Sequence, residues 1–220
     1  ILLSFIAVLA VLSFLRCRIW KDDIRLWTDV LRQYPKTVFA YNSRGAALYG
    51  KGLWKEALLD FNKALELAPS FPEALNNQAM VFVLQKRFDE ALRNYNQAIF
   101  LKPEAGHYLG RGLVYTLTEK FDLAVKDFNQ ALALDPGYEK AYFNRGGVYF
   151  LSGDMPRAVE DYTRVIEINP AEREAYLNRS KAYKDLQDFP RALEDALTAR
   201  RLGSDVGQDY LDSLRQDTAP

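Results

Sequence analysis

The sequence predicts an all-α protein, a solenoid of repeated helix pairs that follows one apolar segment. Prolines recur at positions 35, 69, 103, 136 and 170, a spacing of 33 or 34 residues. Between them, apolar residues recur three or four positions apart, which is typical of amphipathic helices. A fixed period of this length indicates a repeat architecture, in which each unit buries its apolar face against its neighbours.

The composition is that of an ordinary globular protein and excludes several classes of function. Lys plus Arg is 29, Asp plus Glu is 29, and 49% of the residues are apolar. Zero net charge disfavours nucleic-acid binding, which needs an excess of cations. A single cysteine, Cys17, and a single histidine, His107, exclude a disulfide framework, a cysteine-based zinc site and a histidine pair. We therefore expect no metal, no cofactor and no nucleic-acid partner.

The first fifteen residues are apolar and carry no charge. As a helix they would measure about 22 Å, which is short of the roughly 30 Å hydrocarbon core of a bilayer. We expect residues 1–18 to be a transmembrane segment whose first residues are missing, with the membrane contacted through residues 1–15. A buried core helix is the alternative. A signal peptide is disfavoured because there is no basic stretch and no cleavage site. Arg16, Arg18 and Lys21 favour a cytoplasmic flank, but the side of the membrane stays open.

Five units can be aligned, covering residues 38–71, 72–104, 105–138, 139–172 and 173–204, and we number these as the first to fifth repeats. Position 20 of every unit is alanine: Ala57, Ala91, Ala124, Ala158 and Ala192. Position 8 is small: Gly45, Ala79, Gly112, Gly146 and Ser180. Position 24 is aromatic in four units: Phe61, Tyr95, Phe128 and Tyr162. Small residues at positions 8 and 20 let two helices approach closely, and bulky rings fill the space around that contact.

These positions resemble the tetratricopeptide repeat, a helix–turn–helix unit of 34 residues. The resemblance covers residues 38–204, although the consensus tryptophan at position 4 is here Tyr or Leu and the consensus leucine at position 7 is mostly Arg. It implies a right-handed superhelical α-solenoid whose inner face, lined by the first helix of each repeat, binds a protein or peptide. Residues 19–37 are then an N-terminal half-repeat, and residues 205–220 are a capping helix with a tail.

Two polar positions change together along the chain. Position 7 is Arg44, Gln78, Arg111, Arg145 and Arg179. Position 23 is Asp60, Asn94, Asp127, Asp161 and Asp195. Arginine thus accompanies aspartate, and the second repeat has two neutral amides. We expect the two side chains to meet between the helices of a repeat and, where they are arginine and aspartate, to form a fork of two hydrogen bonds. A ligand clamp is the alternative.

No catalytic motif is present, so function must come from the inner face. By resemblance this face includes the position-6 amides Asn77, Asn144 and Asn178, which can pair with the backbone of a ligand. Lys140 with Asn144 resembles the spacing of members that clamp a carboxylate, although only the fourth repeat has it. Apolar candidates form the middle of the face: Met80, Val83, Leu109, Leu113, Phe143 and Phe150. Some of these could instead pack between repeats. His107 is expected on the surface.

The expected function is therefore a non-catalytic, membrane-tethered scaffold that binds a protein or peptide. The stretch from Trp20 to Pro35 adds a narrower resemblance, to the junction in bacterial polytopic membrane proteins that end in tetratricopeptide repeats, such as transmembrane glycosyltransferases. It implies a bacterial inner-membrane location. The alternative function is an accessory C-terminal domain whose catalytic part lies outside this chain, and a soluble adaptor is a third possibility.

Overall fold

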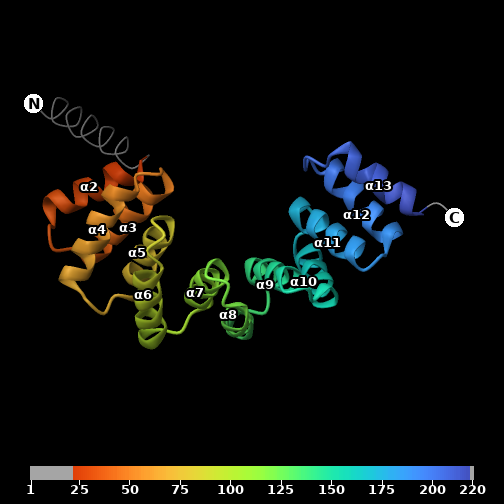
Figure 1. The fold of residues 1–220 in the computed structure, drawn as a ribbon. Helices are drawn as coiled ribbons and strands as arrows, with labels where there is room; N and C mark the ends of the chain where they lie inside the picture. The colour runs from red at the N-terminus through yellow and green to blue at the C-terminus, as the bar shows by residue number, and fades with distance from the viewer. Residues whose placement is uncertain (1–21, 219–220) are drawn as a thin grey trace, which may run out of the picture. The chain divides into compact units, whose positions relative to one another are not determined.

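A computed structural model describes residues 22–218, and this part of the chain forms twelve α-helices and no strand (Figure 1). It divides after Lys102 into two compact units. The apolar segment expected to cross a membrane lies outside the described residues. Within residues 22–218, the helices are too short or too polar for any of them to span a bilayer.

From residue 22 onward, unit 1 contains five helices. They are α2 (Asp23–Gln33), α3 (Val38–Gly50), α4 (Trp54–Leu67), α5 (Pro72–Leu84) and α6 (Phe88–Leu101). The two helices of each repeat pack against each other, α3 with α4 and α5 with α6. Neighbouring repeats are joined by the packing of α4 on α5, and α2 packs on α3. The described part of unit 1 is therefore a stack of two helix pairs with α2 packed against the first pair.

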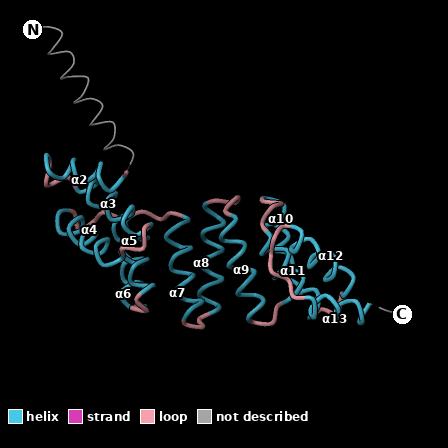
Figure 2. Tube along the Cα trace, turned by 90° about the horizontal axis from the view of Figure 1, so that it is seen from above, coloured by secondary structure: helices cyan, strands magenta, loops and turns pink. Residues whose placement is uncertain are grey.

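Unit 2 contains seven helices. They are α7 (Ala105–Leu117), α8 (Phe121–Leu134), α9 (Glu139–Leu151), α10 (Met155–Ile168), α11 (Arg173–Asp185), α12 (Phe189–Arg201) and α13 (Gln208–Thr218). The pairs are α7 with α8, α9 with α10, and α11 with α12, and they stack in chain order (Figure 2). The helix α13 packs on α12, so that Val206, Leu211 and Leu214 become buried at the end of the stack.

Tight turns reverse the chain inside each repeat. The amide of Leu53 donates to the carbonyl of Leu48 at 3.0 Å, and Asp154 donates to Tyr149 in the same way at 2.8 Å. This bond closes a helix C-terminus and requires a residue with positive φ, usually glycine. Gly153 supplies it with φ 84°, whereas Lys86 and Glu119 adopt φ 58° and 57° without being glycine.

The core is built from the small and large residues that the repeat alternates. All five position-20 alanines are fully buried. Gly112 faces the ring of Phe128 so closely that a Cβ on it would lie 2.7 Å from Cε1. Gly45 faces Phe61 in the same way. In the fifth repeat Ala196 replaces the ring, and position 8 there is the larger Ser180, whose hydroxyl donates to the carbonyl of Ala192 at 2.7 Å.

The expectation for His107 is wrong, because this side chain is buried with 3% of its surface exposed. The repeat explains the burial. His107 stands at position 3, which is alanine and fully buried in the other four repeats: Ala40, Ala74, Ala141 and Ala175. The Nε2 atom of His107 lies 3.7 Å from a carboxylate oxygen of Glu104.

Candidate partner-binding faces

The predicted fork between positions 7 and 23 is confirmed. Nε of Arg145 donates to Oδ2 of Asp161 at 2.8 Å, and Nη2 donates to Oδ1 at 2.6 Å. The first, third and fifth repeats have the same two bonds, each of 2.7–2.9 Å. The aspartate side chains are 3–8% exposed. In the second repeat, Nδ2 of Asn94 donates to Oε1 of Gln78 at 2.5 Å, so that neutral amides replace the ions.

Burial and pairing act in opposite directions on this ion pair. Hydrogen bonds to Asp161 raise the pKa of Arg145, whereas burial raises the pKa of Asp161 despite the bonds from Arg145. The first shift favours the ion pair and the second opposes it. A fork of two bonds from one guanidinium requires the ionised carboxylate, so the shift of Arg145 describes the pair better. The loss of hydration that Asp161 experiences means that the pair contributes little net stability while both partners are present.

The arginines have further contacts that hold them in place. The guanidinium of Arg145 lies 5.5 Å from the ring centre of Tyr142 and 5.9 Å from that of Tyr149, at positions 4 and 11 of the same repeat. Arg179 lies in the same way between Tyr176 and Tyr183. In the second repeat, where the arginine is absent, position 4 is Leu75. Positions 4, 7 and 23 thus change as one packing unit.

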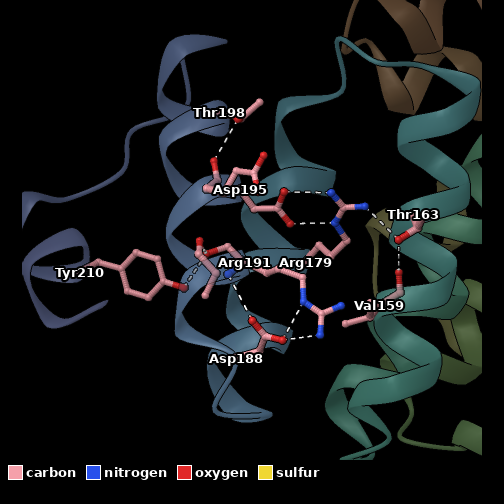
Figure 3. Close-up of polar contacts among 11 residues, drawn as sticks. Val159, Thr163, Arg179, Asp188, Arg191, Asp195, Thr198 and Tyr210 are labelled. Atoms are coloured by element: carbon pink, nitrogen blue, oxygen red, sulfur yellow. Dashed lines mark hydrogen bonds and ion pairs between the residues drawn. The ribbon is translucent and has the colours of Figure 1, made fainter. Parts of the chain in front are cut away.

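A further bond links four of the five position-7 residues to the preceding layer of the stack, and the sequence analysis missed it. Nη1 of Arg179 donates to Oγ1 of Thr163 at 2.9 Å (Figure 3), and Nη1 of Arg145 donates to Oδ1 of Asn129. In unit 1, Arg44 donates to Thr28 at 3.3 Å and Gln78 donates to Asn62 at 2.5 Å. All four acceptors occupy position 25 of the preceding layer, so the signal was an oxygen-bearing residue repeated there. The three guanidinium nitrogens of each of these arginines, and both polar atoms of Gln78, are thus engaged within the stack. The ligand clamp finds no support in this geometry.

In unit 1 the candidate residues belong to one helix, α5. Nδ2 of Asn77 donates to Oδ1 of Asn42 at 2.9 Å, and Asn42 is a buried residue of α3. Met80 and Val83 are half-buried. The Asn77 amide is therefore already engaged between two first helices.

In unit 2 the apolar candidates lie at different depths. Leu109 is part of the core cluster around Phe128, and Leu113 packs against that cluster. Phe143 and Phe150 are half-buried against the cluster of Ala158, Tyr162 and Ala182. The ring of Phe143 meets that of Tyr162 edge to face at 5.8 Å. Asn178 is half-buried on α11. Phe143 is thus an anchored ring that keeps part of its surface open.

Three candidates come together in one pocket between the first helices of two repeats, α9 and α11. Lys140, Phe143 and Asn144 line it, and its volume is about 280 Å³. Its other lining residues are three glutamates that the sequence analysis did not single out: Glu139, Glu172 and Glu174. They stand at positions 1, 34 and 2, where one repeat passes into the next. Counting the charged residues at the repeat boundaries on either side of Lys140 would have identified these glutamates.

The described part of the chain offers no group of three or more His, Cys, Asp or Glu side chains that could hold a metal ion.

Comparison with known proteins agrees with the helix pairs. A family model described as "TPR repeat" matches residues 112–153, and one described as "Tetratricopeptide repeat" matches residues 38–71 and 139–171. The chain carries tetratricopeptide repeats. The sequence-based assignment to this family is thereby confirmed.

Solved tetratricopeptide repeat structures share the fold. PilF of Pseudomonas aeruginosa is similar with a TM-score of 0.75 and 19% identity, over 82% of this chain and 85% of that one. YrrB, described as a TPR protein with an unusual peptide-binding site, has a TM-score of 0.65 and 21% identity, over 86% and 97%. A thermophilic TPR protein of Thermus thermophilus, TTC0263, has a TM-score of 0.65 and 20% identity, over 82% and 98%. No curated protein sequence matches this chain.

Proposed function

We propose that this chain is a non-catalytic scaffold that binds a protein or peptide segment on the face of its first helices. The pocket between α9 and α11 carries the proposal, because it brings Lys140, Phe143 and Asn144 together beside a partly open ring. The fold supports the same role, since one solved structure with it is described as having a peptide-binding site.

The pocket combines the features that a peptide site needs. Phe143 offers an apolar ring that packs against Tyr162. Nδ2 of Asn144 donates to the backbone carbonyl of Lys140 at 2.6 Å, which fixes the side chain and leaves its carbonyl oxygen as an acceptor. A rigid ring and a fixed polar group lower the entropy lost on binding. An apolar side chain fully buried there would contribute about 1.5–3 kcal/mol.

The test uses a random octapeptide library displayed against the full chain, followed by affinity measurements with the selected peptides. Lys140→Trp fills the mouth of the pocket, and Lys126→Trp makes the same change on α8, the second helix of the third repeat. Both lysines are exposed, so neither change should disturb folding. We expect Lys140→Trp alone to weaken binding. Equal binding by both variants, or no selected peptide at all, would refute the proposal.

The proposal includes a membrane tether at residues 1–15 and a bacterial inner-membrane location. The tether is supported by the uncharged, apolar composition of that segment. The location rests on the resemblance of residues 20–35 to the junction in bacterial membrane proteins. We expect the full chain to remain with membranes after extraction at alkaline pH and a chain without residues 1–18 to be released. Release of both chains would remove the tether from the proposal.

A further inference from the structure

We infer that the α9–α11 pocket selects a cationic side chain, so that the bound segment is a peptide with a lysine or arginine next to an apolar residue. This inference rests on the proposed function and specifies its ligand. It is carried by the charges around the pocket and by the aromatic ring in its lining.

Carboxylates dominate the lining. Glu139, Glu172 and Glu174 line the pocket with one cationic residue, Lys140, and Arg173 pairs with Glu174, so the carboxylates exceed the nearby cations by one. Within residues 22–218, Glu139 and Glu172 form no ion pair. Glu139 accepts a hydrogen bond from Asn169 at 3.3 Å, and Glu172 accepts one from the amide of Glu174 at 3.3 Å. Glu174 is 3.5 Å from Arg173 and accepts from Ser204 at 3.1 Å. Among the described residues, the two charges of Glu139 and Glu172 are therefore balanced only by the ammonium group of Lys140, which forms an ion pair with neither of them.

The ring adds a second reason for a cation. An ammonium or guanidinium group is attracted to the face of an aromatic ring within about 6 Å of its centre. Phe143 contacts Tyr162 edge to face and is held by the core, so its remaining surface is fixed next to the glutamates. A side chain with an aliphatic stem and a charged end can cover the ring and reach a carboxylate.

The same charges disfavour the carboxylate ligand that the Lys140–Asn144 spacing suggested. A terminal carboxylate in this pocket would meet three negative groups and one positive group, and like charges placed together are strongly unfavourable. A bare metal ion is also disfavoured, because these glutamates do not form a metal-holding group in the described chain. A lysine or arginine side chain of a peptide can both pair with a carboxylate and contact the ring of Phe143.

The experiment compares three forms of the full chain in the octapeptide selection. The pocket variant is Glu139→Gln, Glu172→Gln and Glu174→Gln. Glutamine keeps the side-chain oxygen that Glu172 uses to cap α11. The control variant is Glu160→Gln, Glu167→Gln and Glu194→Gln, which removes the same charge from the exposed faces of α10 and α12. Circular dichroism establishes that all three forms are folded.

We expect peptides selected by the wild-type chain and the control to be enriched in lysine or arginine beside an apolar residue. We expect the pocket variant to bind those peptides about tenfold more weakly, and replacement of the cation by glutamine in the peptide to have the same effect. Selected peptides that are acidic, or that bind the pocket variant as well as the wild type, would overturn the inference and leave peptide binding intact. The absence of any selected peptide would overturn the proposed function itself.

Discussion

Arg179 and Thr163 join two repeats: Nη1 of the arginine donates to Oγ1 of the threonine at 2.9 Å, and the threonine lies one layer earlier in the stack. The other two donor nitrogens of Arg179 bind Asp195 in its own repeat (Figure 3). One side chain therefore ties together three helices, α10, α11 and α12. Arg145 does the same for α8, α9 and α10. Stability in a solenoid depends on such contacts between neighbours.

Replacing Arg145 by Met should destabilise unit 2 by about 3 kcal/mol, because Asp161 would be left buried without its cation. Urea unfolding followed by circular dichroism measures the change. Unchanged stability would show that the pair is unimportant for folding.

The second repeat offers a rescue for the same pair. Gln78 and Asn94 make the equivalent contact without charge. We expect the double change Arg145→Gln with Asp161→Asn to be more stable than Arg145→Gln alone, because it leaves no unpaired carboxylate. A double variant at least as unstable as the sum of the two single variants would contradict this reasoning.

Removing the acceptor between repeats should have a smaller effect. Thr163→Val deletes the bond from Arg179 and should cost about 1 kcal/mol in the free energy of unfolding. Thr116→Val is the matched control, since both threonines also donate to the carbonyl four residues earlier, at 2.7 and 3.0 Å. Equal losses in the two variants would assign the effect to that local bond and not to the link between repeats.

The close helix contact predicts opposite effects of alanine at two glycines. In Gly112→Ala the new Cβ would collide with Phe128, so we expect a loss of roughly 1–3 kcal/mol. At Gly147 the nearest neighbour of a Cβ is Oη of Tyr162 at 3.8 Å, an ordinary contact. Gly147→Ala should therefore be neutral or stabilise by up to about 1 kcal/mol, since alanine favours the helix. Thermal unfolding distinguishes the two, and a tolerated Gly112→Ala would show that the ring can move.

Alkaline pH should weaken the fold through Tyr162. Burial raises the pKa of this phenol from 10.0 to about 12. Between those values the unfolded chain has lost the proton and the folded chain has kept it, so the contribution to stability falls as the pH rises. At about pH 11 the loss should be about 1 kcal/mol relative to about pH 9. Urea unfolding at both values should show this extra loss in the wild type but not in Tyr162→Phe, a change for which Phe61 and Phe128 are natural precedents. The same pH dependence in both proteins would assign it to other groups.

The sequence alone determined the local structure, because the information for it is repeated five times. Proline spacing, the position-20 alanines and the position-8 glycines fix where helices end and where two of them can touch. The joint change at positions 7 and 23 also identified a contact, since Gln78 with Asn94 replaces Arg with Asp in one step.

Only the tertiary structure decided which residues meet across repeats. The side chain at position 25 accepts a hydrogen bond from the third nitrogen of an arginine in the next repeat. The three glutamates that line the pocket with Phe143 come from the start of the fourth repeat, its end and the start of the fifth repeat. These contacts depend on the distance and rotation between layers, which single-repeat periodicity does not encode. The burial of His107 was missed for a different reason. Its polar side chain suggested the surface, whereas the structure shows that position 3 is buried in every repeat.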